Sequence, residues 1–173
     1  KELLNFLSKS PTAFHAVENY RQILNADGFK ELLESEHWDI VPGGKYYVTR
    51  NNTSILAFKV GTKLDNYSFN IVTSHTDSPT FKVKENAEIE VKNKYTQLNT
   101  EGYGGMLCAT WLDRPLSIAG RVLVSEGNSI VTKLLNIDRD LLMIPNVAIH
   151  MNRAANDGFK YNLQVDMLPL LSG

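Results

Sequence analysis

A histidine and an aspartate two residues apart are the side chains of this sequence best suited to metal chemistry. His75 and Asp77 lie in the run Ile71-Val-Thr-Ser-His-Thr-Asp-Ser-Pro79, whose apolar start is typical of a β-strand. Residues two apart share one face of a strand, so the imidazole and the carboxylate can point at one ion or at one another. Histidine is a common metal ligand, and a carboxylate behind it orients the ring. On spacing alone, the favoured interpretation is a half-buried histidine hydrogen-bonded to a carboxylate.

Five further motifs accompany this one along the chain, and together they favour a metal-binding role for His75 over that interpretation. The series comprises Ser10–Val17, Pro42–Asn51, His75–Lys84, Tyr103–Gly105, Trp111–Val122 and Ile144–Arg153. In this order and at this spacing it resembles the aspartyl aminopeptidase family, the two-metal exopeptidases that also include vacuolar aminopeptidase I. The resemblance covers nearly the whole chain.

The resemblance implies a role for three residues. His75 matches a ligand of one of two catalytic zinc ions, and Asp77 matches the acidic residue that orients this ligand. His150 matches a histidine that reaches the active site of a dimer partner and there stabilises the oxyanion formed from the substrate carbonyl. Without the resemblance, His150 is interpreted as an ordinary histidine that ends an apolar strand.

The same resemblance places the bridging carboxylate, the other ligands and the general base outside this chain. A two-metal hydrolase needs these groups, and the Glu-Glu pair that the family carries does not occur in the sequence. We therefore expect an N-terminal fragment that is inactive by itself. The complete enzyme would release N-terminal residues from peptides, acidic ones as the first expectation and neutral ones such as leucine as the second. The alternative is a catalytically inactive assembly module.

Composition indicates a globular chain without a nucleic-acid footprint. The chain has 173 residues, of which 43% are hydrophobic and 21% charged, with a formal net charge of −1. This balance predicts no nucleic-acid partner, and no apolar run approaches the ~20 residues of a membrane span. Cys108 is the only cysteine, which suits a reducing compartment, and we expect a cytoplasmic location.

Patterning predicts two parts in an α/β fold. Residues 1–84 are expected to form the N-terminal portion of a doubly wound catalytic sheet of the zinc-exopeptidase type. Ser10 and Pro11 are typical of a helix start, and Gly28 of its end. Strands are expected at about 46–50, 54–60 and 69–75, with a hairpin turn at Asn51-Asn52-Thr53.

From residue 85 onward the pattern is typical of β-structure. Residues 87–92 and 162–167 alternate apolar and polar side chains, and the runs 118–124 and 130–135 flank a turn at Glu126–Ser129. The resemblance implies that 85–173 is an inserted dimerisation domain, incomplete here, through which the full enzyme forms dimers and larger homo-oligomers.

Other polar residues receive structural interpretations. We expect His15 to pack beside the apolar helix face and His37 to be solvated in a loop. Asp113 and Arg114 are expected to form an ion pair that fixes a turn before Pro115, and Trp111 to belong to the core. Tyr103-Gly-Gly105 predicts a turn, because it lacks the Lys-Ser/Thr of a phosphate-binding loop.

Overall fold

The computed structural model describes residues 1–172, which divide into two compact units. Unit 1 comprises residues 1–77 and 119–136, and unit 2 comprises residues 78–118 and 137–172. None of the described helices is both long and apolar enough to cross a lipid bilayer.

Unit 1 opens with two helices, α1 (Glu2–Ser8) and α2 (Ala13–Ala26). The predicted start of the second helix at Ser10 and Pro11 is wrong by two residues. Thr12 is the N-cap, with extended backbone and a hydroxyl that accepts from the His15 amide. The Ser10 hydroxyl instead accepts from the Asn19 side-chain amide at 2.9 Å. The predicted end is confirmed, since Gly28 follows the helix with φ of +79°.

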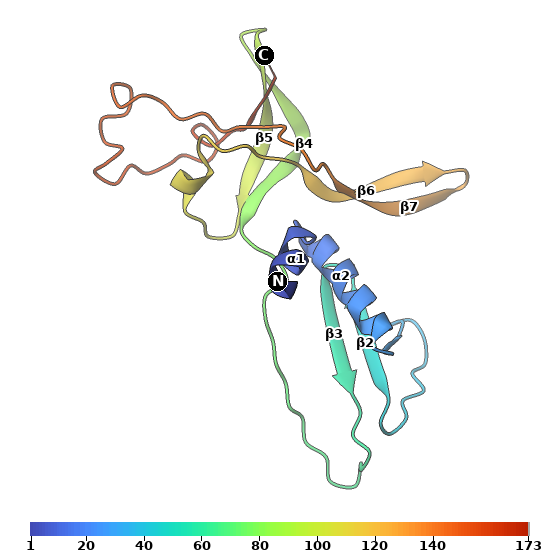
Figure 1. The fold of residues 1–173 in the computed structure, drawn as a ribbon. Helices are drawn as coiled ribbons and strands as arrows, with labels where there is room; N and C mark the ends of the chain where they lie inside the picture. The colour runs from blue at the N-terminus through green and yellow to red at the C-terminus, as the bar shows by residue number, and fades with distance from the viewer. Residues whose placement is uncertain (173) are drawn as a thin grey trace. The chain divides into compact units, whose positions relative to one another are not determined.

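The helix α2 lies against a small mixed sheet (Figure 1). Its strands are β1 (Lys30–Glu31), β2 (Lys45–Arg50) and β3 (Ser54–Lys59), with β1 parallel and β3 antiparallel to β2. The two longer strands confirm the prediction to within one residue. The predicted hairpin turn is confirmed by Asn51 and Asn52, both with φ near +50°. Val17 and Tyr47 are fully buried between helix and sheet.

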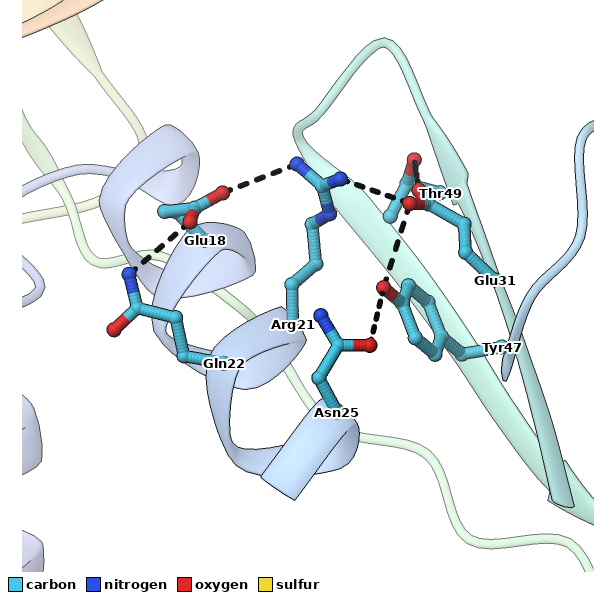
Figure 2. A network of polar contacts seen from close by, with 7 residues as sticks. All are labelled: Glu18, Arg21, Gln22, Asn25, Glu31, Tyr47 and Thr49. Carbon is cyan, nitrogen blue, oxygen red and sulfur yellow. Dashed lines mark hydrogen bonds and ion pairs between the residues drawn. The ribbon is translucent and has the colours of Figure 1, made fainter. Parts of the chain in front are cut away.

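A polar network ties α2 to the sheet (Figure 2). The Arg21 guanidinium donates to Glu31 Oε2 at 2.8 Å and to Glu18 Oε2 at 3.1 Å. The Tyr47 hydroxyl donates to Asn25 Oδ1 at 3.0 Å and lies 3.4 Å from Glu31 Oε2. The Glu31 carboxylate thus links β1, which contains only Lys30 and Glu31, to α2 and to β2 in addition to the backbone pairing of β1 with β2.

Unit 1 also contains the hairpin β6 (Ala119–Glu126) and β7 (Ser129–Asn136), which is the hairpin predicted around Glu126–Ser129. The Arg121 guanidinium donates to the Asn51 carbonyl and side-chain oxygens, both at 3.0 Å, and lies 4.3 Å from the Phe14 ring centroid. One arginine therefore attaches the hairpin to both α2 and the β2–β3 turn.

The predicted strand at 69–75 is wrong. Among the described residues, none pairs in a β-ladder with residues 60–79. An isolated strand leaves its backbone amides and carbonyls without partners, so a run of β-forming residues stays irregular without a neighbour. Its apolar side chains are open to solvent, with Ile71 78% and Val72 95% exposed.

Unit 2 is built on an antiparallel sheet of β4 (Thr80–Val91), β5 (Tyr95–Tyr103) and β8 (Leu170–Ser172). A 3-10 helix, η1 (Cys108–Trp111), follows β5. The predicted turn at Tyr103–Gly105 is confirmed by Gly104, with φ of +76°. Ile144 and Met167 are the fully buried apolar residues of this unit.

The strand predicted at 162–167 is wrong. Residues 163–166 form a turn in which the Asp166 amide donates to the Asn162 carbonyl at 2.7 Å. The Asp166 carboxylate in turn accepts from the Asn162 amide at 2.7 Å. These local bonds satisfy the backbone without a neighbouring strand.

The mixed α/β character predicted from the sequence is confirmed. The doubly wound sheet and the assignment of 85–173 as a dimerisation domain stay predictions, as does the boundary between residues 84 and 85. The hairpin of residues 119–136 groups with unit 1 by its contacts.

Candidate active site

His75 and Asp77 lie in contact in the irregular segment that precedes β4. The His75 Nδ1–H group donates to Asp77 Oδ1 at 3.1 Å. The His75 side chain is 90% exposed and that of Asp77 is 23% exposed. The two residues meet although the predicted strand is absent, because a spacing of two is short enough for the side chains to touch in several backbone conformations.

This pair fits one metal ligand with its orienting carboxylate. With Nδ1 bonded to Asp77, the neutral ring has its lone pair on Nε2, which is then the nitrogen able to bind zinc. A zinc site needs at least three protein ligands, however. Within residues 1–172, no three His, Cys, Asp or Glu side chains gather closely enough to hold a metal ion. His75 and Asp77 alone therefore fall short of the ligand number that a zinc site needs.

His150 lies in unit 2, in a turn and not at the end of a strand. The Met151 amide donates to the Ala148 carbonyl at 2.8 Å, and the Asn152 amide donates to the Ile149 carbonyl at 3.2 Å. The residue is exposed. His75 and Asp77 are thus joined within unit 1, and His150 is carried separately on a tight turn of unit 2.

The other histidines lie where the sequence predicts. His37 is in a loop with its side chain 90% exposed. His15 is part-buried on α2, where its Nδ1 lies 2.8 Å from the Thr12 hydroxyl. Partial burial lowers the pKa of His15.

The predicted ion pair between Asp113 and Arg114 is wrong. Asp113 has φ of +54°, and its Oδ1 accepts instead from the Asn146 amide at 2.9 Å. The carboxylate therefore fixes the turn through a distant backbone group, which adjacency in the sequence could not reveal. Trp111 packs edge-on against Phe81 with ring centroids 5.1 Å apart, but it is only half-buried, so the predicted core position is wrong.

A mixed α/β chain that carries an oriented, exposed histidine suits a metallohydrolase. The profile of the family described as "Aminopeptidase I zinc metalloprotease (M18)" matches residues 6–173. The chain belongs to this family of peptidases.

Two relatives illustrate the sequence similarity. A probable M18 family aminopeptidase 2 of Clostridium novyi is 51% identical over 98% of this chain, and the match covers 40% of that protein. The aspartyl aminopeptidase of Dictyostelium discoideum is 46% identical over 99% of this chain and 36% of that protein. The chain thus spans about two fifths of the length of such relatives.

Solved structures show the same fold. The structure of Chaetomium thermophilum mApe1 superposes with a TM-score of 0.89, at 33% identity over 99% of this chain and 39% of the other. The S. cerevisiae mApe1 dodecamer gives a TM-score of 0.79, at 27% identity over 98% of this chain and 37% of the other.

Proposed function

We propose that this chain is the N-terminal portion of a zinc-dependent aminopeptidase that releases single residues from the amino ends of peptides. Acidic residues are the first substrate class and neutral residues such as leucine the second. The proposal is supported by family membership and by the bond between His75 Nδ1 and Asp77 Oδ1 at 3.1 Å, which leaves Nε2 as the nitrogen for a metal.

The residues of this chain would act as follows. His75 holds one zinc ion through Nε2, while Asp77 keeps the proton on Nδ1 and so fixes the tautomer and orientation of the ring. In an active site with two metals, zinc supplies Lewis acidity and lowers the pKa of water. The remaining ligands come from outside residues 1–173, so this chain alone does not hydrolyse peptides.

His150 would serve the active site of a second subunit. Its position on a tight, exposed turn of unit 2 suits a side chain that is presented to a partner. There it donates a hydrogen bond to the oxygen of the scissile carbonyl as negative charge develops. A two-fold dimer then carries two composite sites, since each subunit gives one His150 and receives one.

A specific observation also favours assembly as a property of this chain. The hairpin β6–β7 exposes apolar side chains, with Leu123 69% and Ile130 74% exposed. Exposed apolar groups of this kind are typical of protein interfaces. The mApe1 of S. cerevisiae forms a dodecamer, and we expect dimers or larger homo-oligomers of the whole protein, located in the cytoplasm.

Metal content tests the assigned roles. In the whole protein, His75→Ala should lose zinc and turnover together, whereas His150→Ala should keep its zinc and lose turnover. His37→Ala is the matched control, because the His37 side chain is as exposed as that of His75, belongs to the same unit and has no predicted role in metal binding. Zinc is measured by mass spectrometry, and turnover with aspartyl and leucyl chromogenic amides. Unchanged zinc in His75→Ala would refute the metal role, and full activity of purified residues 1–173 would refute the need for further ligands.

A further inference from the structure

Unit 2 contains an open cleft beside the 3-10 helix η1. It has a volume of about 390 Å³, and its walls are formed by Thr110, Trp111, Arg114, Pro115 and Leu116. This volume lies within the range of small-molecule sites. All of these residues lie in one short stretch of the chain, between positions 110 and 116.

The backbone on both sides of Arg114 is firmly held. The Asp113 amide donates to the Ile144 carbonyl at 2.9 Å, and the Leu116 amide donates to the Leu142 carbonyl at 2.9 Å. The carbonyl of Leu116 accepts a bond from the Leu142 amide at 3.0 Å. The cleft wall is therefore preorganised, and a ligand would not have to order the loop on binding.

The guanidinium of Arg114 has no bonding partner among the described residues, although the backbone on both sides of it is held. Arg21 and Arg50 each form ion pairs with glutamates. Arg114 makes no ion pair or hydrogen bond with another of residues 1–172, and its neighbour Asp113 is bonded to the Asn146 amide. A fixed loop thus presents a cation whose planar donors match a carboxylate.

The rest of the wall is mostly apolar. Trp111 is held edge-on by Phe81, and Pro115 and Leu116 add aliphatic surface. The Thr110 hydroxyl donates to the Leu107 carbonyl at 2.7 Å and so offers mainly acceptor character. A strongly hydrated anion such as phosphate gains little from such walls, whereas an apolar group attached to a carboxylate can use both features.

We propose that this cleft binds a carboxylate carried on an apolar group, with Arg114 holding the carboxylate and Trp111, Pro115 and Leu116 contacting the apolar part. Two sources share this chemistry. One is the carboxyl end of a peptide whose last residue is apolar, and the other is a free aryl-alkanoic acid. The site is independent of the proposed peptidase activity, because none of its residues belongs to the predicted active site.

Nuclear magnetic resonance tests the proposal, with the 173-residue chain carrying Ile71→Ser and Val72→Ser to suppress the self-association expected from these exposed side chains. N-acetyl-leucine, N-acetyl-leucinamide and 3-phenylpropionate are titrated while the amide signals and the Trp111 indole N–H are followed. The two acids should shift the signals of Thr110, Trp111 and Leu116, and the amide should not. Tighter binding of N-acetyl-leucine identifies a peptide end, and tighter binding of 3-phenylpropionate identifies a free acid. Equal shifts with the acid and its amide would overturn the proposal.

Two charge-matched variants locate the carboxylate. Arg114→Gln should weaken acid binding by about tenfold or more, as expected for loss of a charge-assisted hydrogen bond. Arg139→Gln removes the same charge from an exposed position of unit 2 that does not line the cleft and should leave binding unchanged. Comparable losses in both variants, or no loss in Arg114→Gln, would show that Arg114 is not the anchor.

Discussion

Removal of the Glu31 carboxylate should destabilise unit 1 by a defined amount. Glu31 accepts from Arg21 at 2.8 Å, which is a well-formed charge-assisted bond, and lies 3.4 Å from the hydroxyls of both Tyr47 and Thr49. The two longer contacts contribute little, since such hydroxyl bonds are normally below about 3.0 Å. Tyr47 stays satisfied in the variant through Asn25 at 3.0 Å.

The magnitude follows from the burial of the ion pair. Hydrogen bonds to charged groups contribute about 1.5–3 kcal/mol when buried, and exposed ion pairs about 0–1 kcal/mol. The side chains of Arg21 and Glu31 are 33% and 27% exposed, so Glu31→Ala should cost about 1–2 kcal/mol. Burial acts to lower the pKa of Arg21, but the hydrogen bond to Glu31 and the negative charges of Glu31 and Glu18 outweigh burial and raise the pKa, so the guanidinium stays charged.

Glu18→Ala is the matched control. Glu18 bonds the same guanidinium at 3.1 Å, but its side chain is 40% exposed and lies on the helix surface. Its loss should cost less than about 0.5 kcal/mol. Urea unfolding is followed by the fluorescence of Trp38, in a Trp111→Phe background that confines the signal to unit 1. If Glu31→Ala costs no more than Glu18→Ala, the network does not hold β1 to α2 as inferred.

Three further predictions concern pH, association and activity. Burial lowers the pKa of His15 below its value in the unfolded state, so the unfolded state binds more protons and unit 1 should lose stability as pH falls through about 6.5. His15→Gln should remove this pH dependence of the free energy of unfolding in urea. The same pH dependence in the parent and in His15→Gln would contradict the prediction. The exposed side chains of Ile71 and Val72 should make residues 1–173 self-associate, and the double substitution to serine should lower the mass seen by light scattering; a monodisperse parent monomer would argue against this. Purified residues 1–173 should not release aspartate or leucine from chromogenic amides, and turnover that chelation abolishes would disprove this.

Local signals explain where sequence and structure agree. Asn51 and Asn52 tolerate positive φ, so the turn between β2 and β3 and the register of that hairpin follow from adjacent residues. The contact between His75 and Asp77 is likewise local. Both features depend on residues a few positions apart, which patterning can evaluate.

The prediction from sequence and the structure differ where the outcome depends on which bonding partners a residue or segment finds. Both Ser10 and Thr12 can cap a helix, and the Asn19 side chain decides between them by bonding the Ser10 hydroxyl. The apolar run at 69–75 has the composition of a strand, but a strand also needs a neighbour, which a sequence pattern cannot supply. The role of His150 depends on a second subunit and stays a prediction for the same reason.

Mixed dimers of two inactive variants test the central proposal most directly. Whole protein carrying His75→Ala and whole protein carrying His150→Ala are dissociated, mixed in equal amounts and allowed to reassociate. Half of the dimers should then be mixed, and each mixed dimer has one site with an intact His75 and a partner's intact His150. About one quarter of the parent activity should return, with zinc bound at the restored sites. Mixed dimers that form, as shown by mass spectrometry, but remain inactive would contradict the account in which one subunit supplies His75 and the other His150.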